Sequence, residues 1–130
     1  RNMAEIPKTT LLDYSNGTRK QFDEGAYADI VSTEGGYTSM CITIKPGFDW
    51  RKSVSPLLPG CPAWCPATHF GFMKSGCMKV TYEDGTEKTV NAGESYLIPP
   101  GHLPEVLGEE PAVMVEFSQS TAAVVDKMEK

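Results

Sequence analysis

The chain contains only two histidines, and both stand in settings that suit chemistry. His69 follows Cys65 by four residues and leads into a run that ends at Gly76. His102 comes directly after a Pro-Pro-Gly turn that ends at Gly101. Cysteine sulfur and histidine nitrogen are the ligands that zinc favours in proteins. We therefore expect any chemistry of this protein to centre on these residues.

The spacing between Cys65 and His69 limits how the two side chains could share one ion. On one straight strand, four residues span about 13 Å, whereas the ligands of one ion each lie roughly 2.0–2.3 Å from it. The two residues must therefore lie on either side of a bend. Pro66 cannot donate a ladder hydrogen bond, so we expect a turn over residues 66–68. The alternative is that Cys65 is a small buried residue and His69 a hydrogen-bonded core histidine.

Length and charge narrow the class of protein. A chain of 130 residues is expected to form one domain with a self-sufficient core. The net charge of −5 does not indicate the basic surface that binds nucleic acid or an anionic membrane. No apolar run approaches the ~18 residues of a membrane span, and no signal-peptide layout is visible. We expect a cytoplasmic protein with no nucleic-acid or membrane partner, and leave open whether a targeting segment once preceded Arg1.

The four cysteines are Cys41, Cys61, Cys65 and Cys77. Because a sizeable core is available and no processing signal is visible, free thiols or metal ligands are favoured over two disulfides. Cys61 lies four residues before Cys65 and could be a redox partner or a further ligand, although the prolines between them favour a loop. Cys41 and Cys77 lie in strand patterns and are expected to be packing residues.

The pattern of short alternating segments predicts an all-β protein. Residues 48–66 contain four prolines, so neither a long helix nor a central strand can pass through them, and so long a connector favours a functional loop. Ser118 or Ser120 could cap a short helix over residues 121–128. Evenly spaced strands with glycine and proline turns are typical of an antiparallel sandwich or barrel. The expected strands cover residues 25–31, 36–45, 70–73, 77–82, 86–90, 95–98 and 113–117.

Two motifs in this chain resemble those of the cupin superfamily. Gly93 to Gly101 has the form of the second cupin motif, a glycine, five residues and then Pro-x-Gly. His69 stands seven residues before Gly76, where the first motif has an acidic ligand. The resemblance implies a small double-stranded β-helix barrel of jelly-roll type, usually a homodimer. We therefore expect lead-in strands over 1–35 that pack on the barrel, the cupin barrel over 36–117 and a C-terminal helix over 118–130.

The ligand positions depart from the usual cupin pattern. Metal-binding cupins supply His-x-His and Glu from the first motif and His from the second. Here His69 occupies the Glu position, Cys65 lies near that of the second His, and Pro104 stands where the second motif has its His. The chain is instead similar to a subgroup of uncharacterised single-domain cupins with Cys-x-x-x-His, Pro-Pro-Gly-His and a segment like Val106–Pro111.

The cupin plan implies a new ligand set. In that plan Cys65 and His69 face one cavity from adjoining strands, and His102 enters from the opposite hairpin, although a place at the barrel rim is an alternative for His102. A Cys/His/His set suits zinc, with iron, nickel, copper or manganese as alternatives. Three protein ligands leave a position open for substrate or water, as in catalytic sites.

Other residues are candidates of lower rank. Glu105 follows His102 by three residues and could be a catalytic acid–base group, although a solvated rim carboxylate is the simpler interpretation. Trp64, Tyr82 and Tyr96 could line the pocket, or could anchor the long loop and pack as half-buried barrel aromatics.

The functional hypothesis follows from the proposed site. It is a metal-binding cupin that acts on a small organic molecule as an oxygenase, isomerase or lyase, with the metal as Lewis acid. The alternatives are a non-catalytic cupin that binds or senses a small molecule, and a barrel kept only for oligomerisation. Whether the protein is an enzyme is left open.

Overall fold

A computed structural model of the chain describes residues 8–117 and 119–128, and antiparallel strands are its main regular structure. Parts of the expected lead-in and C-terminal helix, namely residues 1–7, 118, 129 and 130, lie outside the described residues. The strands are β1 (Thr18–Asp23), β2 (Ala26–Ser32), β3 (Thr38–Ile44), β4 (His69–Ser75), β5 (Cys77–Tyr82), β6 (Glu87–Asn91), β7 (Ser95–Ile98), β8 (His102–Leu107) and β9 (Ala112–Glu116). The helices are the 3-10 turns η2 (Tyr14–Asn16) and η3 (Ser55–Leu57) and the α-helices α1 (Trp50–Ser53) and α2 (Gln119–Asp126).

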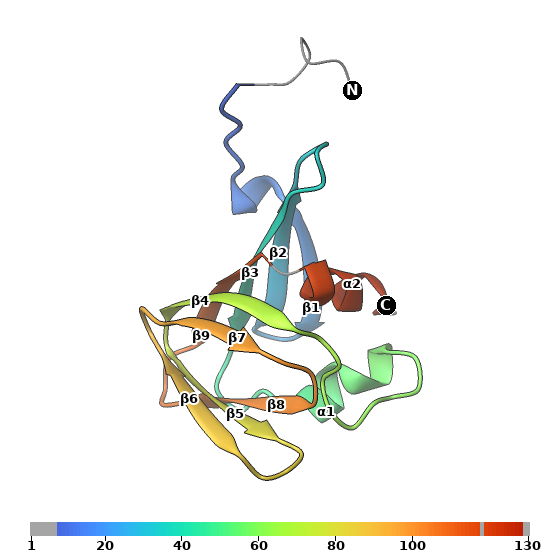
Figure 1. The fold of residues 1–130 in the computed structure, drawn as a ribbon, viewed down its shortest axis with the longest axis vertical. Helices are drawn as coiled ribbons and strands as arrows, with labels where there is room; N and C mark the ends of the chain where they lie inside the picture. Colours follow the sequence, from blue (N-terminus) through green and yellow to red (C-terminus); the bar gives the residue numbers. More distant parts are fainter. Residues whose placement is uncertain (1–7, 118, 129–130) are drawn as a thin grey trace.

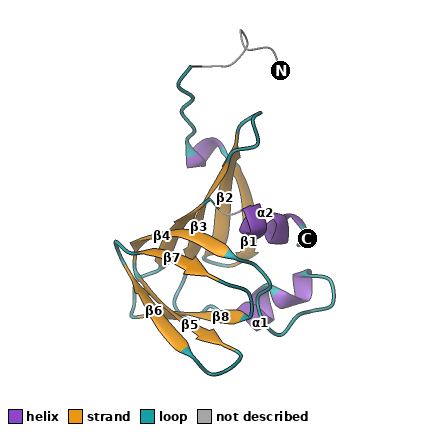
Figure 2. Ribbon diagram, in the orientation of Figure 1, coloured by secondary structure: helices purple, strands orange, loops and turns teal. Residues whose placement is uncertain are grey.

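The strands form two antiparallel sheets that together make the wall of the barrel. The larger sheet has the order β1-β2-β3-β9-β4-β7, and the smaller has the order β6-β5-β8. In Figure 1, β4 and β7 run above β5, β6 and β8, while β1, β2 and β3 extend beyond the closed part. Figure 2 shows both α-helices on the same side of the barrel. The predicted all-β jelly-roll barrel with a short C-terminal helix is confirmed.

The core lies between the two sheets, and strand alternation selects its members. Met40, Ile42 and Ile44 of β3 are buried while their neighbours in the strand are partly exposed. Met78 and Val80 of β5 are buried from the side of the smaller sheet. Each such side chain contributes roughly 1.5–3 kcal/mol on leaving water. The alternation that predicted these strands is therefore also what assembles the core.

Strand β8 is absent from the sequence-based expectations, because Pro104 stands at its centre and has no N–H to donate. The strand is tolerated because it lies at the edge of the smaller sheet, where only one side needs ladder hydrogen bonds. Pro104 pairs with Val80 of β5. As a result His102 opens a strand and is 3% exposed, which places it inside the barrel and away from the rim.

The proline-rich stretch 48–66 contains α1, η3 and one bridge residue, as its sequence requires. The carboxylate of Asp49 caps α1 by accepting hydrogen bonds from the backbone N–H groups of Arg51 and Lys52. Trp50 is buried and fixes this stretch to the core. The prediction that no long helix or central strand passes through these residues is confirmed.

Helix α2 lies over one side of the barrel. Thr121, Val125 and Met128 are buried, and Ala122 and Val124 are partly buried against the core. This is close to the expected helix over 121–128 with its apolar residues at three-residue spacing. Within the described residues, neither helix has the length and apolar character that a membrane crossing would need.

A glycine lies where β4 meets both of its neighbours. Gly71 pairs with Tyr96 of β7 on one side and with Glu116 of β9 on the other. A Cβ atom at this position would lie 2.0 Å from the carbonyl oxygen of Val115, which no real structure allows. The missing side chain therefore lets β9 approach β4 closely. It also lets the Tyr96 hydroxyl donate to Oε2 of Glu116 across it, at 2.6 Å.

We expect Gly71→Ala to lower the free energy of unfolding by about 1–3 kcal/mol, because the added methyl group must push β9 away from β4. Urea unfolding followed by circular dichroism would measure the loss. Gly35→Ala is the control, since a Cβ there meets only side-chain atoms, of Tyr37 at 3.3 Å and of Thr33 at 3.8 Å. Equal losses in the two variants would contradict the close-approach argument.

Candidate metal centre

Cys65, His69 and His102 converge on one point of the barrel interior. Cys65 and His102 form an isolated antiparallel bridge. In it the N–H of Cys65 donates to the carbonyl of His102 at 2.9 Å, and the N–H of Gly101 donates to the carbonyl of Cys65 at 2.8 Å. His69 begins β4. The turn expected over residues 66–68 is not found there, because these residues are irregular and the nearest bend covers residues 63–64. One potential ligand atom from each of the three side chains lies within 4.8 Å of the others.

The orientation of the His69 ring is fixed by its Nδ1 atom. This nitrogen lies 2.8 Å from Oε1 of Glu116 and 3.0 Å from Oγ1 of Thr121. Because a carboxylate oxygen accepts, Nδ1 carries a hydrogen and donates it. The other ring nitrogen, Nε2, then faces the sulfur of Cys65 at 3.7 Å. The outer partners of His69 therefore leave Nε2 for a shared ligand.

His102 is oriented by the same principle but by a different acceptor. Its Nδ1 atom donates to the carbonyl oxygen of Pro99 at 2.7 Å, and a carbonyl oxygen can only accept. Its Nε2 atom is therefore left for other partners. The rings of His69 and His102 lie with their centroids 4.9 Å apart, at an interplanar angle of 72°. Both histidines thus reach the same place with Nδ1 engaged.

The distances fit an ion bound between these side chains. Tetrahedral zinc, with Zn–S near 2.3 Å and Zn–N near 2.0–2.1 Å, holds a sulfur and a nitrogen ligand about 3.6 Å apart. The sulfur of Cys65 and Nε2 of His69 are separated by 3.7 Å. Histidine ligands of metals generally donate their second ring N–H to a carboxylate or a carbonyl, as both rings do here. The sulfur and the two nitrogens therefore form a donor set that fits a divalent metal.

Burial and hydrogen bonding set the charges of the site. Burial disfavours the thiolate of Cys65, but hydrogen bonds with His102 and His69 outweigh it and lower the pKa of Cys65 to about 6. Burial also disfavours the charged His69 ring, but hydrogen bonds with Cys65 and Glu116 raise its pKa to about 10. Without a metal, the two residues therefore form a thiolate–imidazolium pair.

Glu116 and Tyr96 extend this network. Burial disfavours the carboxylate of Glu116, but the hydrogen bond and positive charge of His69, together with hydrogen bonds from Tyr96 and Thr121, outweigh burial and lower the pKa of Glu116. Burial, together with the negative charge of Glu116, raises the pKa of Tyr96. Tyr96 thus stays a neutral donor, and Glu116 stays an anion held by three partners.

The site forms part of the wall of a cavity of about 100 Å³ between the sheets. Cys65, His69, His102 and Glu116 all border this cavity, together with apolar side chains from both sheets and both α-helices. The side chain of His69 is 17% exposed, whereas Cys65 and His102 are each 3% exposed. Solvent therefore reaches the site on the His69 side.

Some candidates from the sequence lie away from this cavity. Strand alternation turns Glu105 outward, where its side chain is 62% exposed and pairs with Lys79 at 3.2 Å. Trp64 packs under the guanidinium of Arg51, which lies 4.7 Å from the ring centroid, and so holds the long loop. Cys61 is exposed, and all four cysteines are free thiols. Glu105, Trp64 and Cys61 therefore do not border the cavity.

The two tyrosines named as pocket candidates lie behind the site, outside the cavity wall. Tyr82 is half-buried, with its ring centroid 6.2 Å from that of His102. Tyr96 is buried, and its hydroxyl reaches the site only through Glu116. Tyr96 therefore contacts the site indirectly, through the carboxylate that orients His69.

Sequence reasoning missed Glu116 and Thr121. The alternation of β9 contained a usable signal, because Glu116 falls two residues after Met114 and so shares its inward side. A charged residue in that register is a candidate partner for a buried histidine. For Thr121 we find no comparable signal, since its contact with His69 spans 52 residues and depends on how α2 lies on the barrel.

No family model matches the chain, and no curated protein sequence matches it. Several solved structures resemble it. A protein of unknown function (DUF1255) from Acidithiobacillus ferrooxidans has a TM-score of 0.57 and 18% identity, over 88% of this chain and 94% of that one. KdgF from Halomonas sp. has a TM-score of 0.57 and 14% identity, over 88% and 99%. An RmlC-like cupin from Shewanella frigidimarina has a TM-score of 0.53 and 11% identity, over 88% and 96%.

An oxalate oxidase structure is also similar to this chain. Its TM-score is 0.57 at 18% identity, over 92% of this chain but only 65% of the oxidase chain. At identities this low, the structural likeness establishes a shared fold. It does not show that the proteins share an activity. Together with the two antiparallel sheets and the enclosed site, they show that this chain has the cupin fold.

Proposed function

We propose that the chain is a metal-dependent cupin that acts on a small organic molecule, with its divalent ion held by Cys65, His69 and His102. One observation carries this proposal. The Nδ1 atoms of both histidines are committed to fixed oxygen acceptors, one from Glu116 and one from Pro99. Their Nε2 atoms are thereby kept away from these oxygen acceptors, and a ligand atom of each ring lies close to that of Cys65.

Zinc is the ion that we expect first. A thiolate with two imidazoles is a common zinc donor set, and iron, nickel, copper or manganese are the alternatives. Three protein ligands leave one position for a water or a substrate atom, as in catalytic zinc sites. When bound, such an ion supplies Lewis acidity toward a substrate oxygen or a bound water, which is compatible with oxygenase, isomerase or lyase chemistry.

The chain's own residues would position and shield this chemistry. Glu116 and Thr121 hold the ring of His69, and the carbonyl of Pro99 holds that of His102. The apolar walls exclude most water and so strengthen the polar interactions at the site. The free thiols favour a reducing compartment, which supports our expectation of a cytoplasmic protein.

A non-catalytic small-molecule-binding or sensing cupin is the second candidate, and one observation favours it. Both oxygens of Glu116 are already engaged, one with His69 and one with Tyr96. Within the described residues, the cavity therefore has no free carboxylate to act as an acid or base. Retained metal without turnover, across a broad panel of small acids, sugars, alcohols and aldehydes, would favour this second candidate.

We also propose that the protein is a homodimer that pairs through the outer face of β4, β7 and β9. Four apolar side chains are exposed there: Phe70 at 56%, Phe72 at 37%, Leu97 at 66% and Phe117 at 53%. Phe70 pairs with Leu97, and the N–H of Phe117 donates to the carbonyl of Phe70, so these residues adjoin. Contiguous exposed apolar surface of this kind marks an interface, and a self-complementary face suits a two-fold dimer.

We expect protein reconstituted with zinc to hold one ion per chain by elemental analysis. Cys65→Ser should weaken zinc binding at least ~10-fold, because a serine hydroxyl stays protonated, and His69→Ala should remove the ion while the barrel stays folded. Cys61→Ser is the matched control, since that thiol is exposed on the same loop. Absence of stoichiometric metal after loading with zinc, iron, nickel and manganese would sink the proposal, as would unchanged metal content in His69→Ala.

Metal binding should depend on pH in a defined direction. Between about pH 6 and about pH 10 the metal-free site holds a thiolate and an imidazolium, so binding should release about one proton per ion. The folded-state pKa of Cys65 lies below its ordinary 9.0, so the thiolate is lost, and affinity falls, as the pH drops through about 6. Calorimetry in buffers of different ionisation enthalpy measures this release, and identical heats in all buffers would contradict the charge assignment.

The proposed dimer interface predicts that an interface variant has a lower molecular mass in solution than the wild-type protein. We expect the wild-type protein to have about twice the 14.2 kDa chain mass in sedimentation, and Phe70→Ser with Leu97→Ser to give the single-chain value. Leu11→Ser serves as the control, because Leu11 is 89% exposed and lies outside this face. A monomeric wild-type protein would rule out the dimer and leave the metal site untouched.

A further inference from the structure

The cavity beside the proposed ligands has almost wholly apolar walls. Both sheets and both α-helices contribute to them, through side chains that include Ile42, Trp50, Met78, Val80 and Val125. Apolar walls favour apolar ligand atoms, and the few polar groups then fix the orientation. The polar side chains on the cavity wall are Cys65, His69, His102, Glu116 and Thr121, all of which belong to the site or to its hydrogen-bond network.

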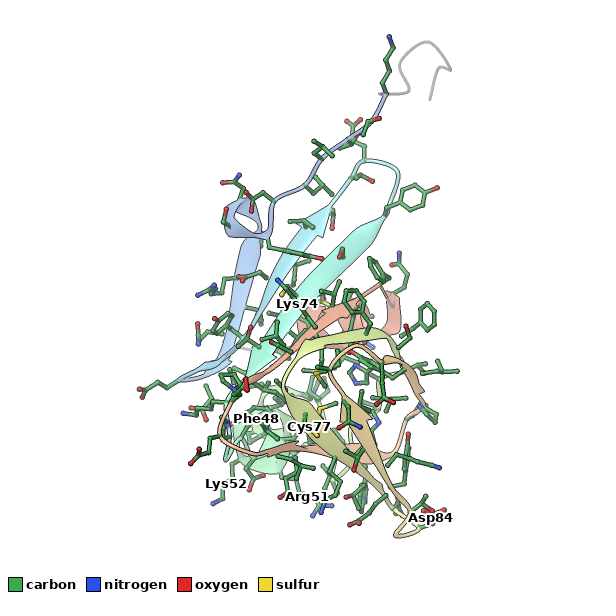
Figure 3. All side chains as sticks on the ribbon, turned by 90° about the vertical axis from the view of Figure 1, so that its left-hand side faces the viewer. Phe48, Arg51, Lys52, Lys74, Cys77 and Asp84 are labelled. Atoms are coloured by element: carbon green, nitrogen blue, oxygen red, sulfur yellow. The ribbon has the colours of Figure 1, made fainter. Side chains whose placement is uncertain are left out.

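Apart from the proposed ion, and the imidazolium of His69 in the metal-free site, the cavity offers no cation to an acidic ligand. Among the described residues, no lysine or arginine borders it. Arg51, next to the wall residue Trp50, instead donates to the carbonyl of Ala63 at 2.7 Å. Figure 3 shows Arg51 and Lys52 at the outer edge of the molecule, well away from Lys74. A carboxylate or phosphate would therefore enter without a lysine or arginine to pair with its charge, which is costly in an apolar site.

The negative charge of Glu116 also disfavours an anionic ligand. This carboxylate is 2% exposed, borders the cavity and has no free oxygen to bind a ligand donor. A second anion in the same small cavity would be repelled at short range, with little solvent to screen the two charges. The walls and the buried charge thus both favour a neutral ligand.

We infer that the site takes a small uncharged molecule, with a short alkyl chain in the cavity and one oxygen or nitrogen atom directed at Cys65, His69 and His102. The direction of that polar atom rests on the proposed metal-dependent function. The cavity volume of about 100 Å³ sets the size. Because a dry apolar cavity of roughly 150 Å³ holds one benzene-sized molecule, this smaller cavity suits a chain of a few carbon atoms better than an aromatic ring.

The test uses four probes with the same short chain: propane, 1-propanol, propanal and propanoate. Binding is measured by ligand-observed NMR and calorimetry, on zinc-loaded protein and on protein treated with a chelator. Propane should bind in both forms, 1-propanol and propanal should bind more tightly in the zinc-loaded form, and propanoate should bind about 100-fold more weakly than 1-propanol. Equal or tighter binding of propanoate, or no binding of any neutral probe, would overturn the inference.

Variants in and just after α2 locate the bound chain. Val125→Phe fills the cavity and should weaken propane binding at least ~10-fold, while Ala123→Phe, on the exposed side of the same helix, should leave it unchanged. Met128→Ala, two residues beyond the helix, removes a wall side chain and should shift the preference from 1-propanol toward benzyl alcohol, which keeps the test usable if Val125→Phe misfolds. Unchanged binding in both cavity variants would contradict the assigned location.

Zinc content measured in the same samples separates this inference from the proposed function. If zinc binds stoichiometrically and propanoate competes equally with 1-propanol, the ligand class is wrong and the metal site stands. If zinc fails to bind but propane binds and Val125→Phe abolishes that binding, the metal-dependent function is wrong and the apolar ligand class stands.

Discussion

The hydrogen bond between Nδ1 of His69 and Oε1 of Glu116 is the interaction on which the site depends. Glu116 is almost fully buried, and leaving such a charge without its partner typically costs about 3–5 kcal/mol. His69 and the Tyr96 hydroxyl satisfy its two oxygens. Gly71 makes the space in which the carboxylate and the phenol meet. The orientation of His69 therefore follows from how closely β9 can lie against β4.

Much of the fold could be predicted from the sequence, because strand alternation and turn residues are local signals. The alternation of Met40, Ile42 and Ile44, for example, predicts both a strand and its buried side. Strand β8 could not be found in this way, because Pro104 is compatible with a strand only at a sheet edge. Whether a strand lies at an edge depends on the order of the strands in the whole sheet, which no local pattern contains.

The residues of the site also differ in whether local sequence patterns could identify them. Cys65, His69 and His102 could be singled out because their residue types are rare in this chain and their settings resemble known motifs. Glu116 was missed, since its role depends on a contact with a residue 47 positions away and the register of β9 is its one local signal. A glutamate among valines reads as the solvent side of a strand unless the register fixes it beside Met114. Local patterns therefore identified the candidate ligands, and tertiary pairing supplied the group that orients one of them.

The charges buried around the cavity connect the metal to the ligand. Without a metal, Cys65 and Glu116 carry two negative charges and His69 one positive charge, which leaves one negative charge in an apolar setting. A divalent ion that displaces the His69 proton brings two positive charges against the same two negative ones, so the buried charges balance. No positive excess then remains to attract an anion, and no lysine or arginine among the described wall residues supplies one. The charge balance that favours a divalent ion is thus the same balance that favours an uncharged ligand.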